Sequence, residues 1–298
     1  MNKAYEFLQQ QTGRVDYKHS LKNLNWFKVG GEADAFFIPQ DTKDLQLFLK
    51  NKPQDVAFFV VGAGSNILIR DGGFKGVVIK LSNLNKMSKV ADYEIYAEAG
   101  CLNISVANFA KDLQIGGLEF LSGIPGSIGG AITMNAGAFS YEFKDVCKTV
   151  NALNLQGELV NFTNEEMGFS YRQNSLEKPY IFIGANLQGQ AKDEDEILIA
   201  MEKIKESREE SQPKKVLTGG STFTNPKGFK AWELIDRAGL RGYSIGGASF
   251  SEKHCNFIIN DGSATAADIE NLISYAIKKV AEKFNILLHP EIKIIGEN

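Results

Sequence analysis

The stretch from Asp55 to Asn66 reads DVAFFVVGAGSN, an apolar run that ends in two glycines separated by one alanine. An unbroken run of this length favours a buried strand. Gly62 and Gly64 then allow a sharp turn, in which backbone N–H groups can converge on a phosphate oxygen. A second apolar run, GVVIKL, follows from Gly76 to Leu81. The pattern predicts a strand, a glycine loop and another strand.

This loop does not match the common nucleotide-binding motifs. The Rossmann pattern GxGxxG needs a glycine at position 67, where the chain has Ile67, and LIRDGGF follows it without helical periodicity. No GK[ST] follows either, which excludes the Walker A motif. A lone GxG turn is also compatible with a tight hairpin, so a phosphate cradle and a structural turn both stay open at this point.

A second glycine-rich segment favours the ligand-binding interpretation. Gly123–Ala131 reads GIPGSIGGA and runs on into Met134–Gly137, MNAG. We expect one continuous loop from Gly123 to Gly137, and Pro125 would stiffen it. Two such loops in one lobe suit a long ligand that carries a pyrophosphate and a flat ring.

Composition excludes several classes of function. The chain has 298 residues, enough for two or three compact lobes, and its net charge of −3 gives no global attraction for nucleic acid or an anionic membrane. Three scattered cysteines (Cys101, Cys147, Cys255) and three scattered histidines (His19, His254, His289) form no metal-binding spacing and no disulfide framework. No segment approaches a membrane span, and the N-terminus lacks the apolar core of a signal peptide. We therefore expect a soluble cytoplasmic protein without a metal site.

The remaining pattern predicts a mixture of helices and strands with a boundary near Asp193, where an acidic helix begins. A later helix has Thr265 as its N-cap and an apolar stripe that we expect in a core. Further helices are expected over 1–14 and 104–113, and strands over 93–99, 149–155, 158–162, 180–187, 255–260 and 292–295.

Several segments together resemble one enzyme family. They are Asn25–Gly31 (NWFKVGG), Gly62–Val77, Gly117–Gly137, Tyr171-Arg172, Gly220–Pro226 (GSTFTNP), Leu234–Gly239, Gly246–Asn260 and His289–Ile292. In this order and spacing the chain resembles the UDP-N-acetylenolpyruvoylglucosamine reductases, flavoenzymes that complete the synthesis of UDP-N-acetylmuramate for bacterial peptidoglycan. The short stretch between Tyr171 and Asp193 is similar to the shorter type of the family.

The resemblance implies a fold and a set of ligands. It implies a two-lobed FAD-binding domain of the vanillyl-alcohol oxidase (PCMH) type over residues 1–195, with lobes near 1–82 and 83–195, and an α+β substrate-binding domain over 196–298. The small molecules would be FAD, NADPH as hydride donor and UDP-GlcNAc-enolpyruvate, handled by a bacterial cytoplasmic monomer. The implied FAD contacts are Val61, Gly62, Ala63, Gly64, Ser65, Asn66, Ile67, Leu68, Gly123, Ile124, Pro125, Gly126, Ser127, Gly129, Gly130, Asn135, Ala136 and Gly137.

Three residues match catalytic positions of the family. A hydride would reach the terminal carbon of the enolpyruvyl group, and negative charge would spread from the adjacent carbon into the carboxylate. Arg172 would stabilise that charge, Ser221 would donate a proton to the carbon, and Glu291 would act with Arg172 at the carboxylate. Tyr171 and Asn225 would contact the substrate. By composition alone these would be a surface arginine, a turn serine and an exposed edge-strand glutamate.

Two positions depart from the family pattern. Thr224 stands where lysine is common, and Asn174 stands where serine is frequent, which puts substrate contacts in doubt more than catalysis. Two other functions remain to be weighed: a flavin oxidase acting on alcohols or sugars, and a nucleotide-sugar binding protein without catalysis. The GSTFTNP and HPEI segments speak against the first, and the retention of all three catalytic matches speaks against the second.

Overall fold

A computed structural model describes residues 3–298 and divides the chain into two compact units. The first holds the chain up to Tyr17, Ala35–Ala63 and Gly76–Arg208, and the second holds Lys18–Asp34, Gly64–Lys75 and Glu209–Asn298. The chain therefore passes from one unit to the other at Ala63-Gly64, within the first glycine loop. The boundary that we predict at 195/196 divides an FAD-binding domain from a substrate-binding domain, and this division by ligand stays a prediction.

The first unit contains a four-stranded sheet whose core is separate from that of the rest of the unit. Phe37, Phe48 and Val77 belong to this core, and the Phe37 and Phe48 rings stack with centroids 5.4 Å apart. The predicted strands on either side of the first glycine loop are confirmed, and they pair in parallel. The sheet order is β1 (Arg14–Ser20), β2 (Glu32–Ile38), β5 (Phe74–Lys80), β3 (Phe58–Val61), with α1 (Thr42–Asn51) and the 3-10 helix η1 (Lys3–Gln10) against it.

The N-terminal helix is shorter than predicted. It ends at Gln10, and strand β1 already begins at Arg14. The Asp44 carboxylate accepts hydrogen bonds from the backbone N–H groups of Thr12 and Gly13 at 2.9 and 2.8 Å, which holds this segment out of a helix. The first two residues of the predicted range lie outside the described part of the chain.

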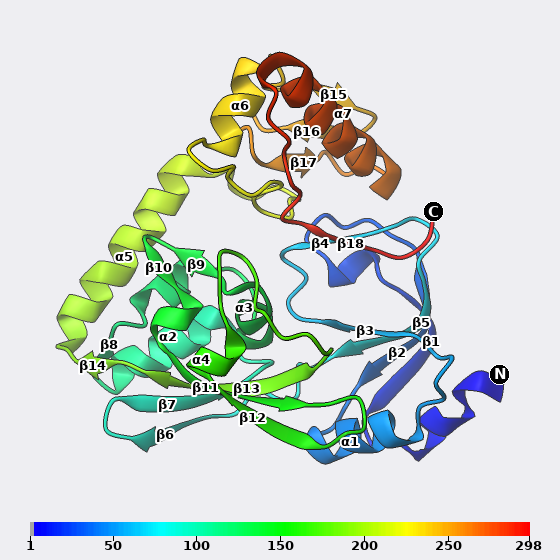
Figure 1. The fold of residues 1–298 in the computed structure, drawn as a ribbon, viewed down its shortest axis with the longest axis vertical. Coiled ribbons are helices and arrows are strands. Elements are labelled where there is room, and N and C mark those ends of the chain that lie inside the picture. The colour runs from blue at the N-terminus through cyan, green and yellow to red at the C-terminus, as the bar shows by residue number, and fades with distance from the viewer. Residues whose placement is uncertain (1–2) are drawn as a thin grey trace. The chain divides into compact units, whose positions relative to one another are not determined.

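A five-stranded sheet carries the second core of the first unit. Its apolar face packs against α2 and α3, as Figure 1 shows, and the strands predicted over 93–99, 149–155, 158–162 and 180–187 are all confirmed. The elements are β12 (Leu159–Thr163), β11 (Cys147–Leu153), β13 (Ile181–Gln188), β7 (Glu94–Glu98), β6 (Met87–Ala91), α2 (Asn103–Asp112), α3 (Ile128–Met134), α4 (Asn164–Met167) and the 3-10 helices η3 (Glu119–Gly123) and η4 (Phe143–Asp145).

The segment expected as one loop from Gly123 to Gly137 is wrong in its middle. Residues 128–134 form α3, in spite of the two glycines in it. Ile128 and Ile132 are fully buried on one face of this helix, and that burial outweighs the low helix propensity of glycine. Asn135 ends the helix in the left-handed conformation, with φ of 40°.

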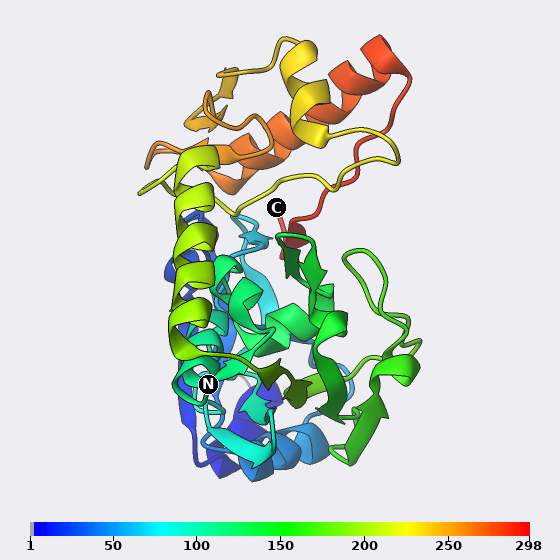
Figure 2. The same cartoon turned by 90° about the vertical axis from the view of Figure 1, so that its left-hand side faces the viewer.

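The acidic helix predicted from Asp193 is α5 (Glu194–Ser211), and it follows the short pairs β9 (Gly137–Ala138) with β10 (Tyr141–Glu142) and β8 (Ile115–Gly116) with β14 (Gln190–Ala191). Ile197 and Met201 of α5 are buried in the core of the first unit, and Figure 2 shows this helix running along it.

The second unit has its core beneath the helix predicted after Thr265. This helix, α7 (Ala266–Phe284), buries the predicted stripe and packs beside α6 (Ala231–Arg237), as seen in Figure 2. The strands predicted over 255–260 and 292–295 are present in shortened form. The strands are β15 (Ser244–Ile245), β16 (Ala248–Phe250), β17 (Ile258–Asn260), β18 (Lys293–Ile295) and β4 (Ile67–Ile69), and the 3-10 helix is η2 (Lys22–Leu24).

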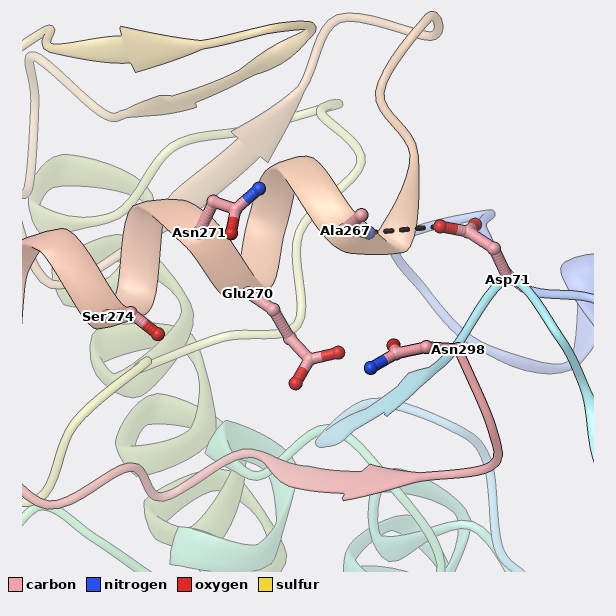
Figure 3. A pocket seen from close by; sticks show the side chains of 6 residues that line it. All are labelled: Asp71, Ala267, Glu270, Asn271, Ser274 and Asn298. Carbon is pink, nitrogen blue, oxygen red and sulfur yellow. Dashed lines mark hydrogen bonds between the residues drawn. The ribbon is translucent and has the colours of Figure 1, made fainter.

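The start of α7 is capped twice. The Thr265 hydroxyl accepts from the Asp268 N–H and the Asp268 carboxylate accepts from the Thr265 N–H, which confirms the predicted capping box. From the segment after β4, the Asp71 carboxylate accepts from the Ala266 N–H at 2.9 Å and from the Ala267 N–H at 3.0 Å, and Figure 3 shows the second of these bonds. This places a negative charge at the positive end of the helix and ties Asp71 to it.

The α+β class is confirmed by this mixture of helices and mostly antiparallel sheets. Over residues 3–298, no helix combines the length and apolar character needed to cross a membrane.

Replacing Asp44 by Ala tests the anchor at the start of β1. The carboxylate also accepts from the Gln40 N–H at 2.8 Å, so the variant leaves three backbone donors without this partner. We expect the free energy of unfolding, measured in urea, to fall by about 2–4 kcal/mol. Asp41→Ala is the matched control, because it removes only the α1 cap and should cost about 1 kcal/mol. Equal losses in the two variants would contradict the anchoring role of Asp44.

Candidate functional site

The two predicted glycine segments meet in the first unit. A Cβ added to Gly62 would lie 2.7 Å from the Ser127 side-chain oxygen, so the glycine leaves room for that hydroxyl. Gly62 thus lies beside Ser127 and Gly130, and Val61 and Ala63 flank it in the same unit, whereas the other predicted residues of the first loop, from Gly64 on, belong to the second unit.

The Ser127 hydroxyl has no hydrogen-bond partner among the described residues, although its side chain is only 4% exposed. A buried hydroxyl without a partner is costly, and a ligand oxygen between the glycine segments would satisfy it. Gly62 and Gly130 have no side chain to cover the backbone beside Ser127, whereas the Gly129 N–H already donates to the Ala99 carbonyl at 2.8 Å. These residues therefore fit a phosphate-bearing cofactor.

Arg172 lies at the end of the second glycine segment. It sits at the tip of a two-residue turn closed by mutual backbone hydrogen bonds between Ser170 and Gln173, and its φ of 62° is in the left-handed region. Its guanidinium donates to the Gly137 carbonyl at 3.3 Å and lies 4.9 Å from the centre of the Tyr171 ring. The structure thus brings the predicted charge-stabilising arginine to a predicted cofactor residue, with Tyr171 exposed beside it.

Buried Asn135 fixes this corner of the first unit. Its amide donates to the Glu142 carboxylate and to the Ser170 carbonyl, both at 3.0 Å, and its oxygen accepts from the Lys144 N–H. Burial opposes ionisation of Glu142, but hydrogen bonds from Lys144 and Asn135 and the charges of Lys144 and Arg172 hold the pKa of this carboxyl below its usual value. Asn135 is thus held by an ionised carboxylate and in turn holds the turn that carries Arg172.

Ser221 and Glu291 come together in the second unit. The Glu291 N–H donates to the Thr222 carbonyl at 2.8 Å, and the Thr224 N–H donates to the His289 carbonyl at 3.0 Å. The two segments are therefore antiparallel neighbours, and Phe223 pairs with Pro290 between these bonds. Seventy residues apart in the sequence, the predicted proton donor and the predicted acid lie on adjacent antiparallel segments.

The segment after Gly64 joins this arrangement. The Asn66 amide donates to the Glu291 carbonyl at 3.1 Å, and the Lys293 N–H donates to the Asn66 carbonyl at 3.0 Å. Ile67 and Leu68 continue into β4, which pairs in parallel with β18. Their side chains are buried, so the predicted cofactor contact of these two residues can come only from their backbone and stays a prediction.

Each of the two glycines before Ser221, in the sequence GGSTF, has a structural reason. A Cβ on Gly219 would lie 2.3 Å from the Phe27 ring, and Gly220 adopts φ of +78°. Phe27 belongs to the predicted family segment NWFKVGG, so packing links that segment to the serine. Both positions thus require glycine, one for space and one for backbone conformation.

Three further predicted positions have identifiable contacts. The Asn225 amide oxygen accepts from the Ala231 N–H at 2.9 Å at the start of α6, and the residue is exposed. Thr224 and Asn174, the two departures from the family pattern, contact the carbonyls of His289 and Thr133 at 3.3 and 3.2 Å. Both therefore lie in the segments that hold the candidate catalytic residues.

Two residues of the site, Asn256 and Arg208, are not predicted by any local sequence pattern. Asn256 is buried next to the Ser221 segment, and Arg208 of α5 donates to the Gly123 carbonyl. Desolvation lowers the pKa of Arg208 and also that of His254, whose Nδ1 accepts from the Asn256 N–H at 3.3 Å. The one available signal was the position of Asn256 inside a family segment, between the more conspicuous Cys255 and the apolar strand.

A pocket of about 300 Å³ lies elsewhere in the second unit (Figure 3). It is lined by Asp71, Ala267, Glu270, Asn271, Ser274 and Asn298, none of which is a predicted site residue. Glu270 forms a two-pronged ion pair with Arg70 at 2.8 and 2.9 Å, and Asp71 caps α7, so the acidic groups there already have structural partners. In the described part of the chain no group of three metal-binding side chains occurs.

Family models match both parts of the chain. A model described as an FAD binding domain matches residues 33–163. A model described as the C-terminal domain of UDP-N-acetylenolpyruvoylglucosamine reductase matches residues 212–295, which include Ser221 and Glu291. The glycine segments that fit a phosphate-bearing cofactor lie in the first of these ranges.

Relatives and solved structures agree with these matches. The UDP-N-acetylenolpyruvoylglucosamine reductase of Rickettsia conorii is 50% identical over 96% of this chain and 97% of its own length, and that of Rickettsia prowazekii is also 50% identical with the same coverage. The crystal structure of the corresponding Thermus caldophilus reductase has a TM-score of 0.82 at 31% identity and covers 95% of this chain and 100% of its own. A berberine bridge enzyme structure (TM-score 0.51, 13% identity, covering 65% of this chain and 44% of its own) shares the fold alone.

The ionised Glu142 carboxylate holds Asn135, which in turn holds the turn that carries Arg172. We therefore expect Glu142→Gln to lose stability in a way that depends on pH. Because the folded-state pKa of Glu142 is lowered, its contribution is complete above the unfolded value, near 4.5, and disappears as the pH falls through the lower folded value. We expect the variant to melt below the wild type at neutral pH, and the difference to shrink under acidic conditions. Melting curves across the acidic range measure this. A gap that stays constant or widens with acidification would contradict the assignment.

Proposed function

Because the chain belongs to the UDP-N-acetylenolpyruvoylglucosamine reductase family, we propose that it reduces UDP-GlcNAc-enolpyruvate to UDP-N-acetylmuramate, with NADPH as the hydride donor. The observation that carries the proposal is the pairing of the Ser221 and Glu291 segments within the range that matches the family's C-terminal domain. The oxidase and pure binding alternatives lose their support, because relatives at 50% identity over nearly the whole chain are named as this reductase.

FAD belongs in the glycine-rich part of the first unit. The Ser127 hydroxyl without a partner and the side-chain-free backbone at Gly62 and Gly130 would hold it. Its isoalloxazine ring, when bound, supplies the redox centre that accepts a hydride from NADPH and delivers one to the substrate. Side chains of this protein would bind the substrate carboxylate and donate the proton.

Arg172 would bind the substrate carboxylate. Hydride addition to the terminal carbon leaves an electron pair that spreads over the adjacent carbon and the carboxylate, so a fixed cation there stabilises the transition state more than the ground state. The guanidinium fork suits two carboxylate oxygens and does not lose its proton near neutral pH. Its bond to Gly137 and its contact with Tyr171 pre-orient it.

Ser221 would donate the proton to the carbon that bears the ether oxygen. A serine hydroxyl is a weak acid in water, but the enolate carbon is a strong base, and fixed placement compensates for the weak acidity. The new C–H bond at this carbon and the hydride at the terminal carbon together convert the enolpyruvyl group into a lactyl group. The alkoxide left on Ser221 then takes up a proton from solvent, which restores the hydroxyl.

Glu291 would support the same carboxylate. Its backbone is fixed on both sides, through the Thr222 carbonyl and the Asn66 amide, so its side chain has a defined origin. We propose that it shares a proton with the substrate carboxylate and thereby limits the negative charge that Arg172 must stabilise.

For the whole protein we propose a bacterial cytoplasmic monomer.

The visible spectrum of the purified protein tests the proposal as a whole. We expect a flavin band that NADPH bleaches and that UDP-GlcNAc-enolpyruvate then restores under anaerobic conditions. A flavin band that NADPH bleaches but only oxygen restores would point to an oxidase. Protein that neither contains nor takes up FAD would rule out the proposed reaction.

Ser221→Ala separates the two half-reactions. The variant should keep bleaching by NADPH, because no proton donation from Ser221 is needed there, and should lose reoxidation by the substrate by roughly 10²- to 10⁴-fold. Stopped-flow absorbance measures both rates. Thr222→Val is the matched control, since it removes the adjacent hydroxyl, which is buried without a partner and should be dispensable. If Thr222→Val rather than Ser221→Ala blocked reoxidation, the donor would be misassigned.

Arg172→Lys keeps the positive charge but removes the two-pronged geometry. We expect reoxidation by the substrate to slow by about 10²-fold, with NADPH bleaching unchanged. Arg14→Lys serves as the control in the same unit, because the Arg14 side chain is 63% exposed and forms an ion pair with Asp16, a residue with no predicted role in the site. Wild-type reoxidation in Arg172→Lys would show that a point charge suffices and that the fork plays no part.

A further inference from the structure

We propose that Asn256 is a positioning residue for Ser221: its side-chain amide takes the place of a neighbouring strand and fixes the backbone that carries the serine hydroxyl. The inference rests on the proposed role of Ser221 as proton donor. Asn256 itself is assigned no contact with substrate or cofactor.

The amide holds both polar groups of one residue. Asn256 Oδ1 accepts from the Phe223 N–H at 2.9 Å, and Asn256 Nδ2 donates to the Phe223 carbonyl at 2.8 Å. The backbone carbonyl of Asn256 accepts from the Thr222 N–H at 2.7 Å. Three hydrogen bonds therefore connect this one residue to the two residues that follow Ser221.

We call the two side-chain hydrogen bonds from Asn256 to Phe223 the clasp, and they lie on the side of Phe223 that faces away from Pro290. Ser221 pairs with Phe257 on one side, while Phe223 pairs with Pro290 on the other. The bonds between these two segments run from the Glu291 N–H to the Thr222 carbonyl and from the Thr224 N–H to the His289 carbonyl, so Phe223 and Pro290 form a non-hydrogen-bonded pair. The N–H and carbonyl of Phe223 therefore face away from Pro290, and the Asn256 amide meets both of them with a group that has the geometry of a peptide unit.

Burial makes the clasp specific for an amide. Asn256 is 5% exposed and Phe223 is 1% exposed, so water does not readily replace either hydrogen bond. The position needs a donor and an acceptor on one short planar group, and among the natural side chains of this length only asparagine supplies both at neutral pH. A side chain that cannot donate would leave the Phe223 carbonyl buried without this partner.

The consequence for Ser221 follows from its distance along the chain. Only Thr222 separates Ser221 from the clasped residue, and Thr222 also accepts from the Glu291 N–H. A shift at Phe223 therefore moves the serine hydroxyl relative to the Glu291 segment. Because a displacement of about 1 Å can slow a positioned reaction about 10²-fold, loss of the clasp should affect proton delivery before it affects the fold.

Asn256→Asp tests this with a side chain of the same shape. As a carboxylate it accepts from the Phe223 N–H but repels the Phe223 carbonyl. As a carboxylic acid it can accept and donate as the amide does. Burial raises the pKa of a carboxyl above about 4, so the protonated form is reached within the acidic range. We expect substrate-driven reoxidation to be about 10²-fold slower than wild type at alkaline pH and to recover as the pH falls.

The comparison with wild type removes the effect of other titrating groups. These are His254 and Cys255 beside Asn256, and His289 and Glu291 on the segment opposite Ser221, all of which are the same in both proteins. Asn271→Asp is the matched control, because it makes the same change at an exposed position of α7 and should follow the wild-type profile at every pH. Bleaching by NADPH should be equal in all three proteins throughout.

A second variant keeps the test decisive if the aspartate variant is unstable at neutral pH. Asn256→Ser is too short to reach both Phe223 groups and has no group that titrates in this range, so it should slow reoxidation to the same degree at every pH. Loss of reoxidation in Asn256→Asp that recovers on acidification, with a constant loss in Asn256→Ser, supports the inference. Wild-type reoxidation in either variant, or a parallel loss of both half-reactions without recovery, overturns it.

The Ser221→Ala variant separates this failure from failure of the proposed function. If Ser221→Ala blocks reoxidation and Asn256→Asp does not, only the positioning role of Asn256 is wrong. If Ser221→Ala reoxidises normally, the proton-donor assignment fails, and the inference about Asn256 fails with it.

Discussion

The hydrogen bond from the Glu291 N–H to the Thr222 carbonyl, 2.8 Å long, sets the geometry on which the candidate chemistry depends. It aligns two segments seventy residues apart, so that the residues predicted to supply a proton and an acidic group lie on neighbouring strands. Around it, Asn66 holds the Glu291 carbonyl and Asn256 holds Phe223. Side-chain amides thus supplement the isolated backbone bridges that join these segments.

The glycine-rich part of the first unit leaves backbone accessible while its apolar residues stay buried in the core. Gly62 and Gly130 leave room beside Ser127, while Ile128 and Ile132 of the same segment are buried beneath them. Arg172 is added to this surface from a separate turn, and Asn135 ties that turn to the end of α3. The glycines thus provide access for a ligand, and the apolar residues between them provide rigidity.

Much of this could be predicted from the sequence, because local patterns encode it. The strands around the first glycine loop, the acidic helix from Asp193 and the capping box at Thr265 all follow from the spacing of apolar and capping residues. The helix over 128–134 could not be predicted, since glycine content argues for a loop and only burial by the rest of the unit outweighs it. Asn256 was equally inaccessible, because its role lies in hydrogen bonds to Phe223, thirty-three positions earlier in the sequence. The pairing of Ser221 with Glu291 was implied by family resemblance and not by any local signal.

Amide hydrogen exchange at Glu291 tests the central structural claim most directly. In the flavin-loaded protein, we expect this amide to exchange as slowly as those of the buried strand β17, because its bond to the Thr222 carbonyl opens only with the unit itself. The Thr224 amide, bonded to the His289 carbonyl, should be protected with it. Exchange of the Glu291 amide at the rate of the exposed residues around Lys227 would contradict a fixed register between the two segments.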